Sequence, residues 1–193
     1  NRKEYLTEVQ DRKNGGPILV DLDFKMSKDN NDRLFDKEII DDIVQTYAET
    51  INEKFDLSKI EEYSIYVLLK DDINEENTDY NKDGIHIQFS FGAKHKEQMY
   101  LRSIVMKKVE NEVFTSMDFE NNTDDIFDKS ISSGSTGWLI YGSCKPGGEP
   151  YKLKYKYNVK IFEDDYELND CSIKKLRSKE IFKELLIRKK NID

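Results

Sequence analysis

The feature that most constrains the fold of this chain is an apolar strand that carries two carboxylates. Across Pro17–Phe24 the side chains alternate between two faces, as they do in a β-strand. Ile18, Val20, Leu22 and Phe24 share one face, and Asp21 and Asp23 share the other. Because an unpaired buried carboxylate costs several kcal/mol, the aspartate face must be solvated or must meet positive charge.

Periodic apolar patterns predict further strands and helices around this one. The predicted strands are Tyr63–Lys70, Gly84–Phe91, Trp138–Tyr141 and Tyr151–Ile161. The predicted helices are Asp36–Phe55, Lys94–Glu110 and Ser178–Lys190. The order of these elements lacks the strict strand–helix alternation of a parallel sheet. We therefore predict an α+β fold in which a mostly antiparallel sheet is flanked by helices.

Two of the predicted strands have one apolar and one polar face. On Gly84–Phe91 the polar face carries His86, Gln88 and Ser90. On Tyr151–Ile161, strict alternation puts Tyr151, Leu153, Tyr155, Tyr157, Val159 and Ile161 on one face and Lys152, Lys154, Lys156 and Lys160 on the other. The acidic segments 70–83 and 162–170 are predicted to be solvated loops, with a turn at Asp83 and Gly84.

Composition limits the class of protein. The chain has 193 residues, 37% hydrophobic and 36% charged, which is enough for one sizeable core under a highly charged surface. It has no apolar run of the ~20 residues that span a membrane, and its polar first segment is not a signal peptide. Cys144 and Cys171 lack metal-ligand spacing and are interpreted as reduced thiols. We therefore expect an intracellular protein without a membrane partner.

The formal net charge of −8 is unfavourable for a protein that binds nucleic acid, unless the basic residues are segregated. Lys145 lies in a flexible Gly/Pro loop, "GSCKPGG", which suits contact with phosphates. The row formed by Lys152, Lys154, Lys156 and Lys160 could follow a nucleic-acid backbone. The alternative is a solvated sheet face on which lysines oppose aggregation.

Asp21 and Asp23 form the first candidate site. Residues i and i+2 of a strand have Cα atoms about 6.6 Å apart, so their carboxylates could bridge two divalent cations about 3.5–4 Å apart. Oxygen ligands of this kind suit Mg²⁺ or Mn²⁺. Asp128 is the candidate third carboxylate, with Asp124 and Asp125 as competitors. The alternatives are a solvated strand end for the pair and a helix N-cap or turn for Asp128.

His86 is the second candidate. It lies beside Gly84, which leaves room for a ligand, and a protonated histidine supplies charge and hydrogen-bond donors to a triphosphate. The alternative is a surface histidine paired to a neighbouring side chain. His95 lies in a polar stretch and is expected to be solvated.

The order of these motifs resembles that of the archaeo-eukaryotic primase superfamily, most closely the primase domain of the primase-helicases of large nucleocytoplasmic DNA viruses. "LVDLDF" with Asp21 and Asp23 matches the first motif, Gly84-Ile85-His86 the small-x-His motif, and Phe127-Asp128 the hydrophobic-Asp motif. Gly137–Leu153 resembles the segment that follows in the viral branch. The chain departs from the pattern in having "FSF" where many viral relatives have "FP", and it contains no G-x-x-x-x-G-K-[ST] helicase motif.

The resemblance implies an RNA-recognition-like catalytic sheet with a small N-terminal α/β element. It implies that Asp21, Asp23 and Asp128 hold two Mg²⁺ or Mn²⁺ ions, and that His86 contacts the triphosphate of an incoming NTP or dNTP. Lys145 and Lys82 are further candidates for charge near the phosphates. The implied reaction is template-directed nucleotidyl transfer that starts primers de novo on single-stranded DNA.

We expect residues 1–193 to form a single catalytic domain, with a motif core at about 16–161 and a C-terminal helical segment at about 172–193. The chain does not begin with Met, and the resemblance implies a fragment of a larger primase-helicase whose helicase lies outside these residues. A viral protein of this kind would act at replication sites in the host cytoplasm or nucleus.

Three other functions remain open from the sequence. A DNA polymerase of the same superfamily would extend primers without starting them. A non-catalytic RNA-recognition-like module would stack bases on an open sheet face, for which Tyr151, Tyr155 and Tyr157 are available, although the aspartate face is polar. A metal-dependent nuclease is the third.

Overall fold

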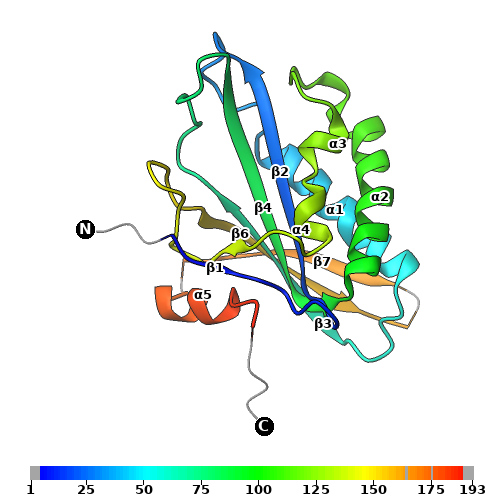
Figure 1. Ribbon diagram of the computed structural model, residues 1–193. Coiled ribbons are helices and arrows are strands. Elements are labelled where there is room, and N and C mark those ends of the chain that lie inside the picture. Colours follow the sequence, from blue (N-terminus) through cyan, green and yellow to red (C-terminus); the bar gives the residue numbers. More distant parts are fainter. Residues whose placement is uncertain (1–4, 164, 175, 189–193) are drawn as a thin grey trace.

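A five-stranded antiparallel sheet forms the centre of the molecule, in the order β2-β4-β3-β6-β7 (Figure 1). Its strands are β2 (Gly16–Ser27), β3 (Glu62–Leu69), β4 (Tyr80–Ala93), β6 (Lys152–Ile161) and β7 (Tyr166–Cys171). This computed structural model describes residues 5–163, 165–174 and 176–188. The predicted α+β class and antiparallel sheet are confirmed.

Two long helices, α1 (Lys37–Lys54) and α2 (His95–Glu112), cover one face of the sheet. The first begins at Asp36, whose side chain accepts a hydrogen bond from the backbone N–H of Ile39. The apolar stripes of both helices and the apolar faces of β2, β3 and β4 form one core. The aspartates of β2 must therefore lie on the opposite face.

The connection β2–α1–β3 carries the chain over this helical face. Because β4 pairs antiparallel with both β2 and β3, those two strands run in the same direction with β4 between them. This is a split β-α-β arrangement. It brings β4 back beside β2, although the two strands are far apart in the sequence.

Shorter elements complete the fold. The strand β1 (Thr7–Glu8) pairs with β5 (Trp138–Leu139), and the short helices are η1 (Phe114–Ser116), α3 (Thr123–Ile126), α4 (Lys129–Ser132) and α5 (Ser178–Glu184). Between residue 5 and β2 the described structure contains β1 and no helix. No helix in the described part of the chain has both the length and the apolar character needed to cross a membrane.

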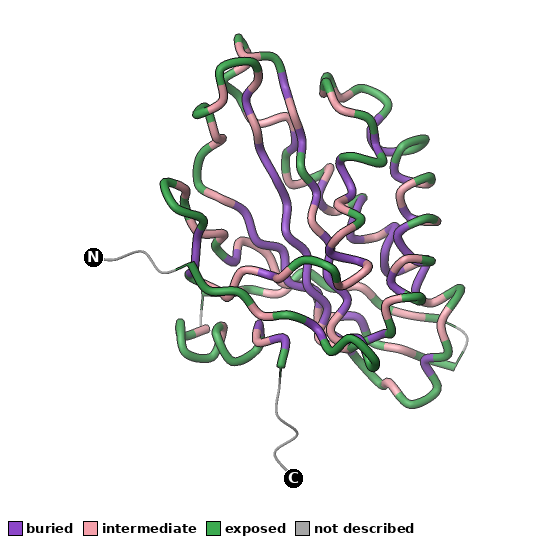
Figure 2. Tube along the Cα trace, in the orientation of Figure 1, coloured by how far each residue is buried: buried purple, intermediate pink, exposed green. Residues whose placement is uncertain are grey.

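The second face of the sheet is partly covered. Trp138 packs there with Leu19, Ile131 and Ile187. Leu185, just after α5, packs in a further cluster with Tyr66, Leu68 and Leu153. Figure 2 shows the buried strands of the sheet at the centre, with exposed loops around them. The face that a base-stacking module would leave open is thus largely occupied by the chain's own apolar side chains.

Two predicted loop features are strands instead. The acidic segment 162–170 contains most of β7, because Tyr166 and Leu168 pack against the core while Glu167 between them stays exposed. Asp83 and Gly84 lie inside β4 rather than in a turn. The charge of buried Asp83 is offset by Arg33, whose Nε donates to Asp83 Oδ2 at 2.6 Å.

The strict alternation predicted for β6 is also wrong. Tyr155 pairs with Val67, but Leu153 pairs with the next residue, Leu68, so Lys154 is an extra residue of the kind found in a β-bulge. Leu153 therefore packs on the second face, while Tyr157 packs in the core on the helical face. A bulge reverses which residues share a face, and periodicity alone does not reveal it.

Two smaller differences concern the ends of elements and the cysteines. Helix α5 ends at Glu184, and positions 189 and 190 of the predicted helix lie outside the described residues. Both cysteines are free: Cys144 is buried, and Cys171 is half-buried at the end of β7.

Phe24 provides a test of this packing. Its ring is fully buried on the face of β2 opposite the aspartates and contacts the rings of Phe35, Phe114 and Phe119. We expect Phe24→Ala to lower the free energy of unfolding by about 3–5 kcal/mol in urea denaturation. Phe162→Ala is the matched control, because that ring is 54% exposed, and it should change stability by less than about 0.5 kcal/mol. Equal effects of the two variants would contradict the assignment of the core.

Candidate functional site

A pocket of about 430 Å³ lies on the second face of the sheet, between the polar face of β2 and β4 and the loop that follows β5. Its lining includes every side chain predicted from the sequence to carry the chemistry: Asp21, Asp23, Lys82, His86, Asp128 and Lys145. Segments separated by more than a hundred residues thus meet around one cavity.

The pairing of β2 with β4 builds the floor of this pocket. Asp21 lies directly opposite His86, and Asp23 lies directly opposite Gly84. Residues opposite each other in an antiparallel pair project to the same face, so both aspartates and the histidine are neighbours. His86 Nε2 lies 3.3 Å from Asp21 Oδ1.

Asp128 reaches the pocket through a short backbone connection to β2. Phe127 forms a bridge with Leu22, and the N–H of Asp128 donates to the carbonyl of Asp21 at 2.9 Å. Arg102 of α2 anchors the same segment, because its Nε and Nη2 both donate to the Phe127 carbonyl. In the sequence, Arg102 is marked only as a lone arginine within an apolar helix stripe, which does not by itself indicate this role.

The rival aspartates lie elsewhere. Asp124 accepts a hydrogen bond from Arg102 Nη2 at 2.9 Å, and its side chain is 67% exposed. Asp125 accepts a hydrogen bond from the side chain of Asn122 at the start of α3. Neither lines the pocket. Of the three candidates, Asp128 is therefore the one that can act together with Asp21 and Asp23.

Asp128 also caps a helix, which was its alternative interpretation. Its Oδ1 accepts from the N–H of Ser130, and its Oδ2 accepts from the Ser130 hydroxyl. A carboxylate has about four lone-pair positions, so capping leaves acceptor capacity toward the pocket. In the part of the chain that the structure describes, no three His, Cys, Asp or Glu side chains are already arranged as a metal site.

The aspartate pair nevertheless has the chemistry of a site for hard cations. Asp21 Oδ1 is buried and accepts no hydrogen bond within the described structure. Burial, followed by the charge of Asp21, raises the pKa of Asp23 to about 6. Two neighbouring carboxylates of this kind are stabilised by a cation, and their oxygens are the ligands that Mg²⁺ and Mn²⁺ prefer.

His86 is not a surface histidine. It is buried, and its imidazole lies between the ring of Tyr151, with centroids 3.5 Å apart, and that of Trp138, with centroids 4.2 Å apart. The other part of that alternative, a histidine paired to a neighbouring side chain, is observed, since His86 Nε2 faces Asp21. Sequence reasoning singled out neither Tyr151 nor Trp138 for this place.

Gly84 does not leave empty space for a ligand. A Cβ at this position would lie 2.7 Å from the Tyr151 hydroxyl and 2.9 Å from the Leu22 carbonyl. The room that a side chain would need is filled by the protein itself. Packing within the site thus explains why position 84, the small residue of the small-x-His motif, is a glycine.

The lysines divide into two groups. Lys82 and Lys145 line the pocket, together with Lys70, which the sequence analysis did not select. In the predicted row along β6, Lys152 and Lys154 both pair with Asp71, Lys156 lies over the Tyr66 ring, and Lys160 is exposed. The three lysines of the pocket lie beside six carboxylates, those of Asp21, Asp23, Glu76, Asp83, Asp128 and Glu149.

His95 also differs from expectation. It is half-buried at the start of α2, where its Nε2 lies 3.1 Å from the Asp11 carbonyl and its ring packs against Gly134. It ties the N-terminal turn to the segment after α4 and lies outside the pocket.

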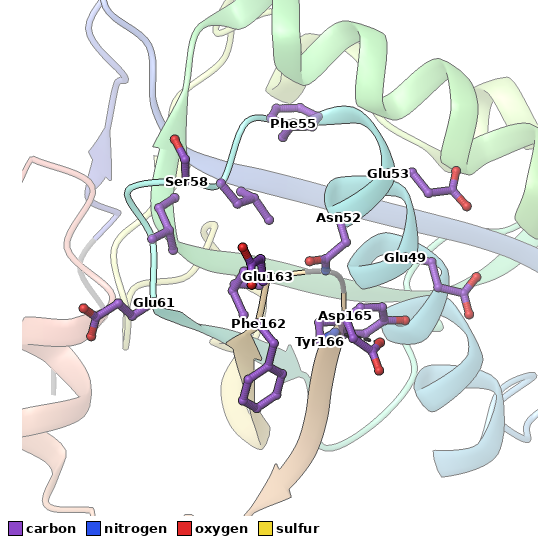
Figure 3. Close-up of a pocket in the computed structure, with 13 residues that line it drawn as sticks. Glu49, Asn52, Glu53, Phe55, Ser58, Glu61, Phe162, Glu163, Asp165 and Tyr166 are labelled. Atoms are coloured by element: carbon purple, nitrogen blue, oxygen red, sulfur yellow. Dashed lines mark hydrogen bonds between the residues drawn. The ribbon is translucent and has the colours of Figure 1, made fainter.

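A second and larger cavity, of about 790 Å³, lies beside the end of β6 and the segment between α1 and β3 (Figure 3). Its acidic lining residues are Glu49, Glu53, Glu61, Glu163 and Asp165. The lining residues that the structure describes include no lysine or arginine. Because these lining residues offer a phosphate no basic side chain, the size of this cavity does not make it the better candidate for a nucleotide site.

Comparison with known proteins identifies the chain. Residues 1–157 match the family model described as the C962R protein N-terminal AEP domain, where AEP denotes archaeo-eukaryotic primase. The chain belongs to the archaeo-eukaryotic primase family. This primase-family domain is also 29% identical over 156 residues to "Putative helicase L207/L206" of Acanthamoeba polyphaga mimivirus. The match covers 79% of this chain and 16% of that protein.

Gly84 offers a test of the packing in this primase-family site. We expect Gly84→Ala to lower the free energy of unfolding by about 1–3 kcal/mol, because the added methyl overpacks the site. Gly148→Ala is the control in the same pocket, since its Cβ would meet only the Lys145 carbonyl at 3.4 Å. Urea denaturation of both variants measures the difference. A neutral Gly84→Ala would show that the Tyr151 hydroxyl does not occupy this space.

Proposed function

We propose that this primase-family domain is a DNA primase that starts primers de novo on single-stranded DNA by template-directed nucleotidyl transfer. The observation that carries the proposal is the meeting of Asp21, Asp23 and Asp128 in one pocket with lysines. Paired or triple carboxylates beside positive charge are suited to a nucleoside triphosphate with its metal ions. The family to which the chain belongs supports the same reaction class.

In this proposal Asp21, Asp23 and Asp128 hold two Mg²⁺ or Mn²⁺ ions. Divalent ions in such a site lower the pKa of an attacking hydroxyl and stabilise the charge of the departing pyrophosphate. Lys82, Lys145 and Lys70 contribute positive charge for the phosphates of an NTP or dNTP. His86 borders this triphosphate site, with its Nε2 toward Asp21.

The electrostatics resolve the difficulty raised by the net charge of −8. Many acidic side chains lie away from the pocket, including those around the larger cavity. The carboxylates within the pocket are the ones that bound cations neutralise. A template strand would therefore meet a local field set by the lysines and carboxylates of the pocket and by the bound metal ions, rather than by the charge of the whole chain.

We further propose that the chain is part of a longer primase-helicase. The mimivirus relative is named a helicase, and the chain spans only 16% of its length. On this view residues 1–193 form one catalytic domain with a motif core at about 16–161 and a C-terminal segment at about 172–193. The domain would act at viral replication sites in the cytoplasm or nucleus of the host.

The packing argues against a non-catalytic base-stacking module. Tyr157 is buried on the helical face, where its hydroxyl donates to Asp41, and Lys37 lies over the rings of both Tyr155 and Tyr157. Tyr151 is stacked on His86. None of the three tyrosines proposed for stacking is thus a free platform.

Metal binding provides the first test. We expect Mn²⁺ to bind the chain in calorimetry, and Asp21→Asn or Asp23→Asn to weaken that binding and abolish primer synthesis. Asparagine preserves the shape of the side chain and removes the charge, so the fold should remain, as checked by circular dichroism. Unchanged Mn²⁺ affinity and activity in both variants would refute the assignment.

Asp128 can be tested separately from its role as a cap. Asparagine is as good an N-cap as aspartate, so Asp128→Asn should leave the melting temperature nearly unchanged. We expect it to lower the rate of primer synthesis at least about 100-fold, in line with the loss of a group that stabilises transition-state charge. Asp124→Asn is the control and should retain activity. The reverse ranking would make Asp124 the functional carboxylate.

The choice among the enzymatic alternatives needs one further assay. Template, nucleotides and Mg²⁺ or Mn²⁺ are incubated with and without a primer. Product without a primer supports a primase, whereas product only with a primer identifies a polymerase. Shortening of a labelled DNA strand identifies a nuclease.

A further inference from the structure

The ring of Tyr151 is the part of the site that the reaction described above leaves without a role. It lines the pocket, and its plane lies 14° from that of the His86 imidazole, with centroids 3.5 Å apart. Trp138 lies against the same imidazole at 4.2 Å. The histidine is thus held between two aromatic rings that come from the loop after β5 and from β5 itself.

This arrangement restricts how the imidazole can turn. A histidine side chain in an open pocket can rotate about its Cβ–Cγ bond, and a half-turn would put Cε1 in the place of Nε2. Here that rotation would drive the ring into one of its flanking neighbours. The stack therefore keeps Nε2 at 3.3 Å from Asp21 Oδ1.

Tyr151 is itself fixed at its other end. Its hydroxyl lies 2.7 Å from the point where a Cβ of residue 84 would be, and Lys70 Nζ lies 5.1 Å from the centre of its ring. A larger residue at position 84 would push the hydroxyl away and tilt the ring. The glycine and the histidine of Gly84-Ile85-His86 are linked through this one tyrosine.

We propose that Tyr151 is a positioning residue that, together with Trp138, holds the His86 imidazole against Asp21. The functional part of this inference rests on the proposed nucleotidyl transfer, because His86 then borders the triphosphate site. The geometric part does not rest on it. Tyr151 acts through His86 and makes no chemical contribution of its own.

The geometric part is tested by NMR of the imidazole protons. The chain has two histidines, His86 and His95, so the spectrum is simple to assign with His86→Ala. The flanking rings should shift the His86 ring protons upfield by their ring currents. We expect Tyr151→Leu to move these resonances downfield and Tyr151→Phe to leave them nearly in place, with His95 unchanged in both. Unmoved His86 resonances in Tyr151→Leu would overturn the proposal.

The functional part is tested by steady-state primer synthesis. An aromatic pair of this kind corresponds to about a three- to tenfold effect, so we expect Tyr151→Leu to raise the apparent KM for nucleotide by that factor with a smaller change in kcat. Tyr151→Phe should stay within about twofold of the wild type, because it keeps the ring. A large loss in Tyr151→Phe would instead assign a direct role to the hydroxyl and overturn the proposal.

A double variant shows whether Tyr151 acts through His86. If it does, Tyr151→Leu combined with His86→Ala should be no worse than His86→Ala alone. Additive effects would contradict the proposal. Tyr155→Leu is the matched control, since this half-buried tyrosine lies four residues away but packs on the helical face. It should change neither the His86 resonances nor KM.

The two parts of the experiment fail separately. A wild-type chain that makes no product but shows the ring-current shift would refute the proposed primase function and leave the Tyr151–His86 arrangement intact. An active wild type whose His86 resonances and KM do not respond to Tyr151→Leu would refute the positioning role alone.

Discussion

The site depends on the register in which β2 pairs with β4. That register sets Asp21 opposite His86 and Asp23 opposite Gly84, on the face away from the helices. A slip by one residue would turn both aspartates into the core and expose the apolar residues that alternate with them along β2. The large aromatic and aliphatic side chains on the other face of β2 make such a slip costly, because they are buried against α1 and α2. Packing on the helical face of β2 thus fixes the positions of Asp21 and Asp23 on its other face.

The remaining side chains of the pocket are attached to this strand pair by specific contacts. Arg102 and the bridge between Phe127 and Leu22 bring Asp128 beside β2, where its N–H donates to the Asp21 carbonyl. Tyr151 and Trp138 enclose His86. Each attachment places a functional group beside the aspartates. The carboxylate charge that remains is the property on which the proposed cation binding rests.

Much of the fold could be predicted from the sequence where a pattern is local. The long helices, the β2 and β4 faces and the antiparallel class follow from periodicity, and the motif order identified the family. Predictions failed where a local rule was overridden by a distant partner. Asp83 and Gly84 resemble a turn but lie in a strand, because Arg33 neutralises Asp83 and Tyr151 fills the space beside Gly84. Lys154 breaks the alternation of β6 because Leu153 gains burial on the second face.

The sequence by itself determined which residues can do chemistry and on which face of a strand they lie, since side-chain alternation is a property of the backbone. It could not determine which of Asp124, Asp125 and Asp128 joins the pair, because that choice depends on hydrogen bonds across the fold, one from Arg102 to Asp124 and one from the Asp128 N–H to the Asp21 carbonyl. Nor could it show that His86 is enclosed by two rings. Only the tertiary structure decided these points, because residues distant in the chain become neighbours through strand pairing and loop packing, which no local pattern encodes.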